Sequence, residues 1–420
     1  MWVFSHQAIA LLIFVVTYLI LATEFRERTI AAMAGAGAVW AFGILSSEEA
    51  LSYVDLRAIG LLFGMMVIVG ALREARFFQL VGRYVSEICR GRPTYLLVAF
   101  IVITAALSAF LDNVTTIIFM VAITIDLAEL VKFDPKPYVL SEIIASNIGG
   151  VGTLIGDPPN IMIAAATGFS FGEFAKNVGV VSIISLLVAL LYLRKRFARE
   201  IGTEKLSLSG FPPIIPERRL LWTGIAALLG AVTLFVLQDI IGIYPSTVAL
   251  AAATLLLFVG GPKMPEILRE VEWSTLIFFG SLFIVVGALE KTGWMQLLSH
   301  WILLTIGDNR LLGITVVLWI SSMGSAFIDN IPFAAAFIPV LTDLGRSGLN
   351  VYPLWWALSA GTGLGGNGTL IGASANVIAA GIAQARGVKI SFAEFFKVGM
   401  ITLLITTAVS NMILLVMFVQ

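Results

Sequence analysis

The chain has 420 residues, of which 59% are hydrophobic and 12% are charged, and its mean hydropathy is +0.99. Soluble globular chains are about half apolar and about a quarter charged, so this composition excludes a soluble enzyme, a secreted domain, a nucleic-acid-binding protein and a disordered protein. The 26 basic residues equal the 26 acidic ones, so no field attracts polyanions. One cysteine, Cys89, and two distant histidines predict neither a disulfide framework nor a metal site.

Apolar stretches of bilayer-crossing length recur along the chain, each near the 20 residues that a spanning helix needs. Longer apolar tracts interrupted by polar or glycine-rich segments lie between them. The N-terminal stretch has no basic flank and no cleavage site, so we expect a retained helix and not a signal peptide. The single spans are 7–22, 29–45, 56–72, 177–193, 220–237, 244–260, 274–289 and 398–418, and the interrupted tracts are 95–130, 138–167, 311–344 and 355–385.

Basic residues indicate the orientation in the membrane, because cytoplasmic loops are enriched in Lys and Arg. Most of the 26 basic residues fall in loops on one side, including the polar stretch 194–219. The other side holds only Arg57, Lys176, Lys291, Arg310 and Arg346. The rich side is therefore predicted to be cytoplasmic, with both termini outside a cell inner membrane.

The two halves of the chain share strings in the same order. The string 108–113, SAFLDN, recurs as SAFIDN at 325–330, and GTLIG at 152–156 recurs at 368–372. A third pair, SFGEF at 170–174 and SFAEF at 391–395, completes the repeat. We therefore predict a first repeat over 1–193, a cytoplasmic linker over 194–219 and a second repeat over 220–420.

Each repeat is predicted to hold three spans, an amphipathic segment, a re-entrant hairpin, a broken span and a last span. Five crossings per half place the second repeat upside down relative to the first, a pattern typical of secondary transporters. The predicted fold class is an all-α polytopic membrane protein with two inverted repeats. It has about 10 transmembrane helices, two re-entrant hairpins and discontinuous helices, as expected for such transporters.

Polar motifs interrupt the long tracts at membrane depth, where irregular backbone is tolerated only beside protein or a water-filled cavity. Asp112-Asn113 and Asp329-Asn330 suit hairpin tips. The glycine-rich strings at 146–153 and 361–369 suit broken helices, whose half-helix ends aim backbone groups at a site near the membrane midplane.

These motifs resemble the ion transporter superfamily. The Asp-Asn pairs, SNIGGVGTLIGDPPN at 146–160 and GGNGTLIGASAN at 365–376 are most similar to one of its branches. That branch holds bacterial arsenite permeases, sodium/proton antiporters of the NhaD type and the melanosomal P protein. The resemblance implies a scaffold domain and a transport domain that bears both hairpins and moves in an elevator-like cycle, in some members as a homodimer. It leaves metalloid, cation and anion substrates open.

Three aspartates are the candidate coupling groups: Asp112, Asp329 and Asp157. Ionisable groups at membrane depth are costly and usually functional. The alternative is N-capping of the helix that follows each one, which Asp also does well. Asp157 has Ala373 as its repeat partner, so this carboxylate exists in one half only, as a single coupling-ion site would require.

Neutral side chains and glycines around these aspartates are the candidate substrate ligands, with interhelical hydrogen bonding as the alternative role for each. Asp126, Glu129 and Glu142 are expected at solvated helix ends. The candidate ligands are Asn113, Thr115, Thr116, Ser146, Asn147, Gly149, Asn160, Asn330, Asn367, Gly368, Thr369, Ser374 and Asn376.

The predicted core contains carboxylates but no Lys or Arg, which favours a neutral, hydroxyl-rich cargo over a dicarboxylate-like anion. Arsenite and antimonite are neutral trihydroxides near pH 7. We therefore expect proton-coupled efflux of arsenite and antimonite, with sodium/proton antiport or anion transport as alternatives.

No cofactor beyond H⁺ or Na⁺ as coupling ion is expected. No enzyme or nucleotide motif occurs, so an ATPase would be a separate subunit. The partners expected are the lipid bilayer and a small inorganic substrate, with a homodimer left open.

Overall fold

The structure, a computed structural model, describes residues 2–23, 25–202, 215–260, 263–307 and 309–418. These residues form helices and loops, with no strand among them. The first half holds α1 (Trp2–Thr23), α2 (Arg28–Ala41), α3 (Ser47–Tyr53), α4 (Leu56–Glu74), α5 (Phe77–Cys89), α6 (Pro93–Ser108), α7 (Asn113–Val131), α8 (Lys136–Val151), α9 (Pro158–Thr167), α10 (Phe171–Phe174), the π-helical turn η1 (Ala175–Gly179) and α11 (Val180–Phe197).

The second half repeats this order, with small additions. It holds α12 (Arg218–Val236), α13 (Gln238–Ile241), α14 (Pro245–Gly260), α15 (Met264–Arg269), α16 (Trp273–Lys291), α17 (Trp294–Ile306), α18 (Arg310–Phe327), α19 (Asn330–Arg346), α20 (Tyr352–Gly365), the 3₁₀ turn η3 (Leu370–Gly372), α21 (Ser374–Ala385) and α22 (Phe392–Phe418).

Seven segments of the described chain are helical, long and apolar enough to cross a membrane. Shorter apolar helices accompany them, including α6 and α17. This confirms the all-helical polytopic fold class, and every predicted span and tract contains a helix. The seven segments are Leu56–Glu74, Asn113–Val131, Phe171–Phe197, Arg218–Val236, Trp273–Lys291, Arg310–Phe327 and Phe392–Phe418.

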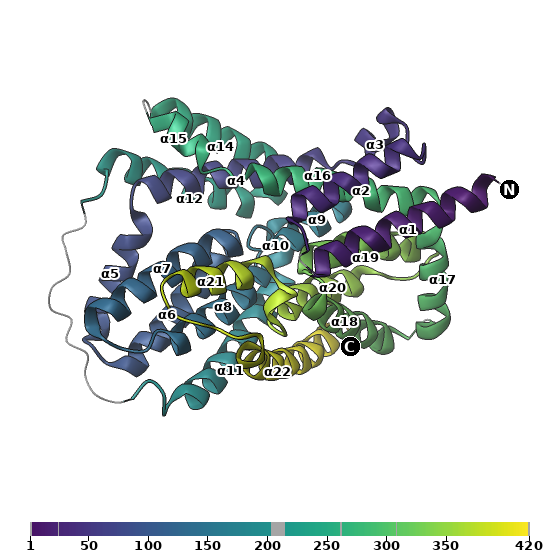
Figure 1. Cartoon of the computed structure of the whole chain (residues 1–420). Helices are drawn as coiled ribbons and strands as arrows, with labels where there is room; N and C mark the ends of the chain where they lie inside the picture. The colour runs from purple at the N-terminus through teal and green to yellow at the C-terminus, as the bar shows by residue number, and fades with distance from the viewer. Residues whose placement is uncertain (1, 24, 203–214, 261–262, 308, 419–420) are drawn as a thin grey trace.

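The helices form two layers (Figure 1). The first layer, here called the scaffold layer, contains α1–α4 and α12–α16. Within it α4 packs against α14, and α2 packs in the same way against α16, so equivalent helices of the two repeats make equivalent contacts. The second, here called the hairpin layer, contains α6–α11 and α18–α22. Helices α5 and α17 lead from one layer to the other in the two repeats.

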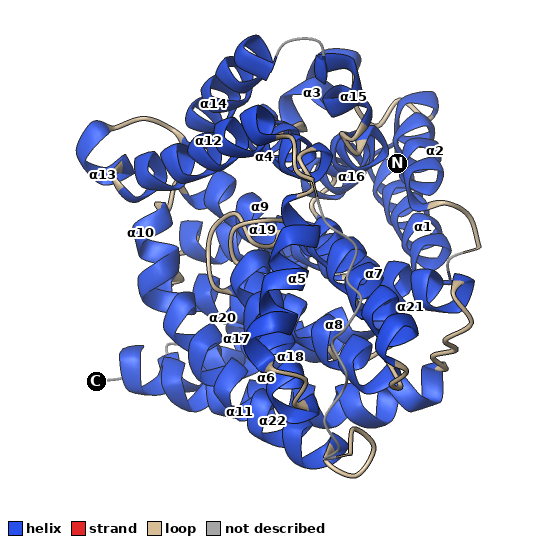
Figure 2. Ribbon diagram, turned by 90° about the vertical axis from the view of Figure 1, so that its left-hand side faces the viewer, coloured by secondary structure: helices blue, strands red, loops and turns tan. Residues whose placement is uncertain are grey.

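Each predicted hairpin is a pair of helices with a tip of a few residues. Helices α6 and α7 meet at residues 109–112, and α18 and α19 meet at residues 328–329. The broken spans also appear, with breaks at residues 152–157 and 366–373. Helix α7 packs against α21 and α19 packs against α9, so each hairpin arm lies beside the broken helix of the other repeat (Figure 2).

Two short helices of the scaffold layer were not predicted. Helix α3 lies between the predicted spans 29–45 and 56–72, and α15 is its counterpart in the second half. Ser46 and Glu49 form a capping box at the start of α3, a signal present in the sequence. Residues 203–214 of the predicted linker lie outside the described residues, while α11 extends to Phe197 and α12 begins at Arg218.

Close helix packing in the scaffold layer gives a first prediction. A Cβ atom at Gly64 of α4 would lie 2.6 Å from the backbone of Ala249 on α14, whereas one at Gly37 of α2 would meet nothing within 4 Å. Gly64→Leu should therefore lower the free energy of unfolding by about 3 kcal/mol or more through overpacking. The matched Gly37→Leu should change it by less than about 1 kcal/mol. Thermal unfolding in detergent measures both, and equal effects would contradict the packing described.

Candidate functional site

The two hairpin tips begin their return helices with an aspartate. Asp112 accepts a hydrogen bond from the backbone N–H of Thr115 (2.9 Å), and Asp329 accepts one from the N–H of Ile331 (3.1 Å). Both carboxylates thus satisfy orphan donors at a helix start, which is the capping role expected as the alternative. The second oxygen of Asp329 has partners outside its own helix, Ser374 and Arg28.

Asp157 does not cap its helix, although it occupies the N-cap position of α9. Its side chain makes no cap hydrogen bond and is 1% exposed. Both carboxylate oxygens instead accept from the Nδ2 of Asn330, at 2.9 and 3.0 Å. The expectation of a capping role for Asp157 is therefore wrong, because the tip of the second hairpin supplies a stronger partner across the repeat interface.

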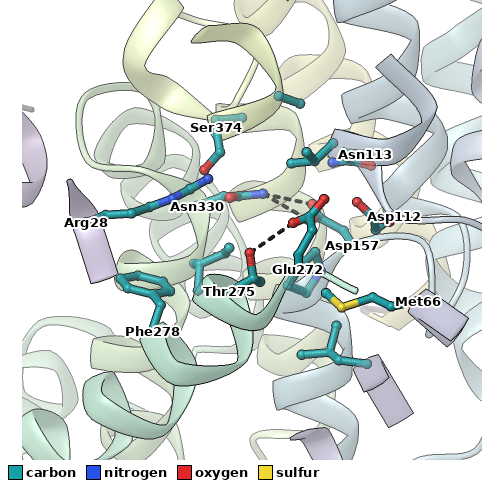
Figure 3. A pocket seen from close by; sticks show the side chains of 16 residues that line it. Arg28, Met66, Asp112, Asn113, Asp157, Glu272, Thr275, Phe278, Asn330 and Ser374 are labelled. Carbon is teal, nitrogen blue, oxygen red and sulfur yellow. Dashed lines mark hydrogen bonds between the residues drawn. The ribbon is translucent and has the colours of Figure 1, made fainter. Parts of the chain in front are cut away.

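These groups converge on one small cavity, here called the tip pocket, with a volume of about 30 Å³. That is room for on the order of two water molecules. Figure 3 shows Asp112, Asn113, Asp157, Asn330 and Ser374 pointing toward one another there. Of the sequence-predicted residues, these five are the ones that the structure brings together around the cavity.

The scaffold layer closes the tip pocket with side chains that sequence analysis missed: Arg28 from α2, and Glu272, Thr275 and Phe278 from the start of α16. Thr275 donates to a carboxylate oxygen of Glu272 at 2.9 Å. The expectation of a core without Lys or Arg is wrong, since Arg28 reaches it. Arg28 was counted as a loop residue, and no pattern in the sequence places the start of α2 beside a hairpin tip.

Arg28 is already paired. Its guanidinium lies 3.6 Å from a carboxylate oxygen of Asp329, and its Cζ is 5.9 Å from the ring centroid of Phe278. The same oxygen of Asp329 accepts a hydrogen bond from Ser374 at 2.5 Å. Asp112, Asp157 and Glu272 have no ion pair among the described residues. The tip pocket is therefore rich in unpaired carboxyl groups, while the guanidinium of Arg28 is paired with Asp329.

A larger cavity adjoins the tip pocket on the Arg28 side. This vestibule has a volume of about 530 Å³ and is lined by the end of α1, the start of α2 and α21. It includes Phe25, which is 73% exposed, so the cavity reaches the protein surface. Arg28, Phe278 and Ser374 line both cavities and form the boundary between them.

The equivalent place in the other repeat is nearly closed. Aligned on the shared strings, Arg28, Phe278 and Val377 of the vestibule correspond to Pro245, Leu61 and Ile161, which line a cavity of only about 40 Å³. Arg57 covers it by stacking on the ring of Tyr244, with 4.0 Å between Cζ and the ring centroid. The two repeats therefore build two passages, and only the one beside Arg28 is wide.

Amides hold the broken helices together behind the pocket. The Nδ2 of Asn147 donates to Asn367 (3.1 Å) and to Asn376 (3.0 Å), which joins the two repeats. Asn160 and Asn376 donate to break carbonyls, including those of Thr153 (2.8 Å) and Thr369 (3.0 Å). These predicted ligands thus make structural hydrogen bonds, although Asn147 Oδ1 and Asn367 Nδ2 are buried without a partner.

The remaining predicted ligands lie around the pocket and not in its lining. Ser146 shares a hydrogen-bonded cluster with Ser108 and Asn113. A Cβ at Gly149 or at Gly368 would collide with the neighbouring hairpin arm, so these glycines permit close packing. Thr115 gives its backbone N–H to Asp112, Thr116 Oγ1 is buried without a partner, and Thr369 donates to the carbonyl of Ala326.

Glu142 does not lie at a solvated helix end. Asp126 and Glu129 are exposed as expected, and both pair with Arg386. Glu142 is instead completely buried on α8, so that expectation is wrong. Helix α8 is enclosed on all sides in the hairpin layer, which its apolar tract alone did not reveal. Among the described residues, no cluster of three or more His, Cys, Asp or Glu side chains could hold a metal ion.

Comparison with known proteins connects this architecture to transporters. The family model of the citrate transporters, CitMHS, matches residues 18–361. The 46 kDa membrane protein of Mycobacterium leprae is 35% identical over 97% of this chain and 98% of its own. The human P protein is 32% identical over 98% of this chain and 60% of its own, which confirms the resemblance drawn from the Asp-Asn pairs and the glycine-rich strings. The YdaH transporter of Alcanivorax borkumensis shares the fold, with a TM-score of 0.60, 13% identity and coverage of 90% of this chain and 88% of its own.

The contact between Asn330 and Asp157 gives a second prediction. Asn330→Ala removes both hydrogen bonds to a buried carboxylate and should lower the free energy of unfolding by about 2 kcal/mol. In an Asp157→Asn background the same substitution should cost less than half as much, because an amide donor replaces one of the two acceptor oxygens. Thermal unfolding of the four proteins of this cycle measures the coupling, with exposed Ser347→Ala as a control. Additive effects would show that the two side chains do not depend on each other.

Proposed function

The chain belongs to the citrate transporter family, CitMHS, and is a membrane transporter and not an enzyme; on that premise we propose that it couples proton entry to the efflux of arsenite and antimonite. The observation that carries this proposal is the composition of the tip pocket. It offers carboxylates, amides and two hydroxyls, and its guanidinium is paired with Asp329.

A neutral trihydroxide fits such a lining better than an anion does. Each hydroxyl both donates and accepts, so it can pair with Asn113, Asn330 and Ser374 as well as with carboxylate oxygens. A citrate-like anion would meet Asp112, Asp157 and Glu272 at close range, and like charges in a dry site repel strongly. Arg28, the one basic side chain of the lining among the described residues, would first have to leave Asp329.

Protons are the proposed coupling ion because three carboxyl groups of the lining, Asp112, Asp157 and Glu272, have no ion pair among the described residues. Asp112 and Asp157 are the proposed carriers, since neither has an ion pair among the described residues. Asp329 is held by Arg28 and Ser374, so we assign it a positioning role at the boundary with the vestibule. Neutralising a carboxylate by protonation lowers the cost of moving it through the membrane.

Alternating access is supported by the unequal passages. The wide vestibule lies on the side that the basic loops predict to be cytoplasmic, while Arg57 and Tyr244 close the equivalent passage on the other side. Sliding of the hairpin layer against the scaffold layer would exchange the two arrangements, since the repeats are related by inversion. We propose a cell inner membrane location with both termini outside, and leave a homodimer or an ATPase subunit to experiment.

Sodium/proton exchange is the second candidate. Asp112, Asp157 and Glu272 line one cavity of about 30 Å³, so their combined negative charge would attract a small cation, although these side chains do not form a metal-ligand cluster among the described residues. Citrate, which the family's name mentions, is a third cargo to test. The carboxylate-rich lining disfavours citrate, because the negative charges of the lining and of the cargo repel each other.

Transport by inverted membrane vesicles with an imposed pH gradient separates these candidates. Arsenite should accumulate and the accumulation should collapse with a protonophore. Asp112→Asn or Asp157→Asn should reduce proton-driven accumulation by roughly 10-fold or more, because each removes a group that can cycle between charged and neutral. The control is Asp126→Asn, which alters only an exposed ion pair and should change accumulation by less than about twofold.

The other outcomes are equally informative. Proton flux triggered by Na⁺ without arsenite movement would overturn the metalloid proposal and favour the cation exchanger. Citrate uptake with no response to arsenite or Na⁺ would overturn both. In that case Arg28→Gln should abolish uptake, since Arg28 is the one basic side chain that lines the tip pocket among the described residues.

Labelling tests the proposed access from one side. In a Cys89→Ala background, Val377→Cys lies in the vestibule and its repeat equivalent, Ile161→Cys, lies beside the closed passage. A membrane-impermeant maleimide should label Val377→Cys from the cytoplasmic side at least about 10-fold faster than Ile161→Cys from the outside, because Ile161 is 3% exposed. Removing the stack with Tyr244→Leu should increase labelling of Ile161→Cys. Equal labelling of the two positions in the parent protein would argue against unequal passages.

A further inference from the structure

Glu142 is a buried carboxyl group that the tip pocket does not use. It is 0% exposed, and one of its oxygens, Oε1, accepts a hydrogen bond of 2.5 Å from the hydroxyl of Thr124 on α7. The other, Oε2, is buried with no hydrogen-bond partner, and no described residue forms an ion pair with Glu142. An ionised carboxylate in such surroundings is costly, so the group carries a proton at rest.

The second repeat shows that the fold does not require this pair. Aligned on the shared strings, Thr124 and Glu142 correspond to Leu341 and Leu358, both completely buried. Two leucines therefore fill the equivalent place between α19 and α20. A buried polar pair usually stabilises a protein no more than two apolar side chains in the same place would. The presence of Thr124 and Glu142 in one repeat therefore suggests a role other than stability.

Glu142 lies between the tip pocket and the exposed start of α8. Ser146 is one turn further along the same face of α8, and its Oγ lies 3.1 Å from that of Ser108, which donates to Asn113 at 2.6 Å. Asn113 lines the tip pocket. Polar groups thus lead from the pocket to within one helical turn of the carboxyl, and Lys136 begins α8 two turns beyond at the protein surface.

The helices that pack against α8 bring little charge near this group. Helices α6, α20 and α21 contain no charged residue. The titratable and charged residues on the elements around α8, with Lys136 and Tyr138 of α8 itself, are Tyr95, Asp126, Glu129, Tyr192, Arg194, Lys195, Arg196, Tyr352, Glu394 and Lys397. Asp126 and Glu129 are paired with Arg386, and Glu394 is paired with Lys136.

We propose that Glu142 is a second proton-binding site, separate from the tip pocket and present in one repeat only. When sliding of the layers opens the tip pocket and water follows the hydroxyls of Ser108 and Ser146 to Oε2, the O–H bond breaks, the proton passes to water, and Thr124 stays hydrogen-bonded to the carboxylate. Reprotonation from water in the other position restores the acid. This deepens the proposed function, because it rests on protons being the coupling ion.

Infrared difference spectra of the purified full-length protein in lipid test this site without any cargo. Between mildly acidic and alkaline pH, the wild-type protein should show loss of a carboxylic C=O band. That band should be missing in Glu142→Gln and unchanged in Asp126→Asn. In vesicles, Glu142→Gln should reduce proton-driven cargo accumulation by roughly 10-fold, while exchange of cargo without a pH gradient stays within about twofold.

A double variant that copies the second repeat, Thr124→Leu with Glu142→Leu, provides the structural control. It should unfold at the same temperature as the wild type or higher, and it should share the coupling defect of Glu142→Gln. Wild-type coupling and an unchanged C=O band in both variants would overturn the proposal. A wild-type protein that moves cargo without protons would instead overturn the proposed coupling ion, and the band would still report on Glu142.

Discussion

Irregular backbone buried inside an apolar protein has to find its hydrogen bonds within the protein, and this constraint organises the hairpin layer. The breaks after α8 and α20 expose carbonyls that no helix satisfies. Asn160 and Asn376 supply the donors at equivalent positions, each reaching carbonyls of its own break. Thr153 and Thr369 donate in the same way to Ala109 and Ala326 in the hairpins. Asn147 of the first repeat then donates hydrogen bonds to Asn367 and Asn376 of the second, so the two breaks are joined directly.

The proposed function depends on where this symmetry fails. The amides and hydroxyls that support the backbone occur in both repeats. The repeats differ at other positions. Asp157 is aligned with Ala373, Thr124 and Glu142 are aligned with two leucines, and Arg28 is aligned with Pro245. A symmetric frame lets two opposite conformations have similar energies, which alternating access needs. These unequal residues lie in or beside that frame, and the other repeat builds the same frame without them.

An ion pair between Arg28 and Asp329 joins the two layers at their boundary. Arg28 belongs to the scaffold layer, whereas Asp329 and Ser374 belong to the hairpin layer. The contact between Arg28 and Asp329 would therefore have to break in the proposed sliding of the layers. An ion pair that is partly exposed is weak enough to be exchanged for water or cargo. A fully buried pair would be harder to separate, because breaking it costs about 3–5 kcal/mol.

The sequence alone determined the class of fold, because spanning length, glycine-rich breaks and the repeated Asp-Asn strings are local properties of the chain. It placed Asp112, Asn113, Asn330 and Ser374 in the site for that reason. The tertiary structure decided what depends on the approach of distant elements. It turned Asp157 from its own helix end to Asn330, buried Glu142, and brought Arg28 and Glu272 to the pocket. Periodicity and motifs report the faces of one helix, whereas the partner of a side chain depends on how the two layers pack, which no local pattern records.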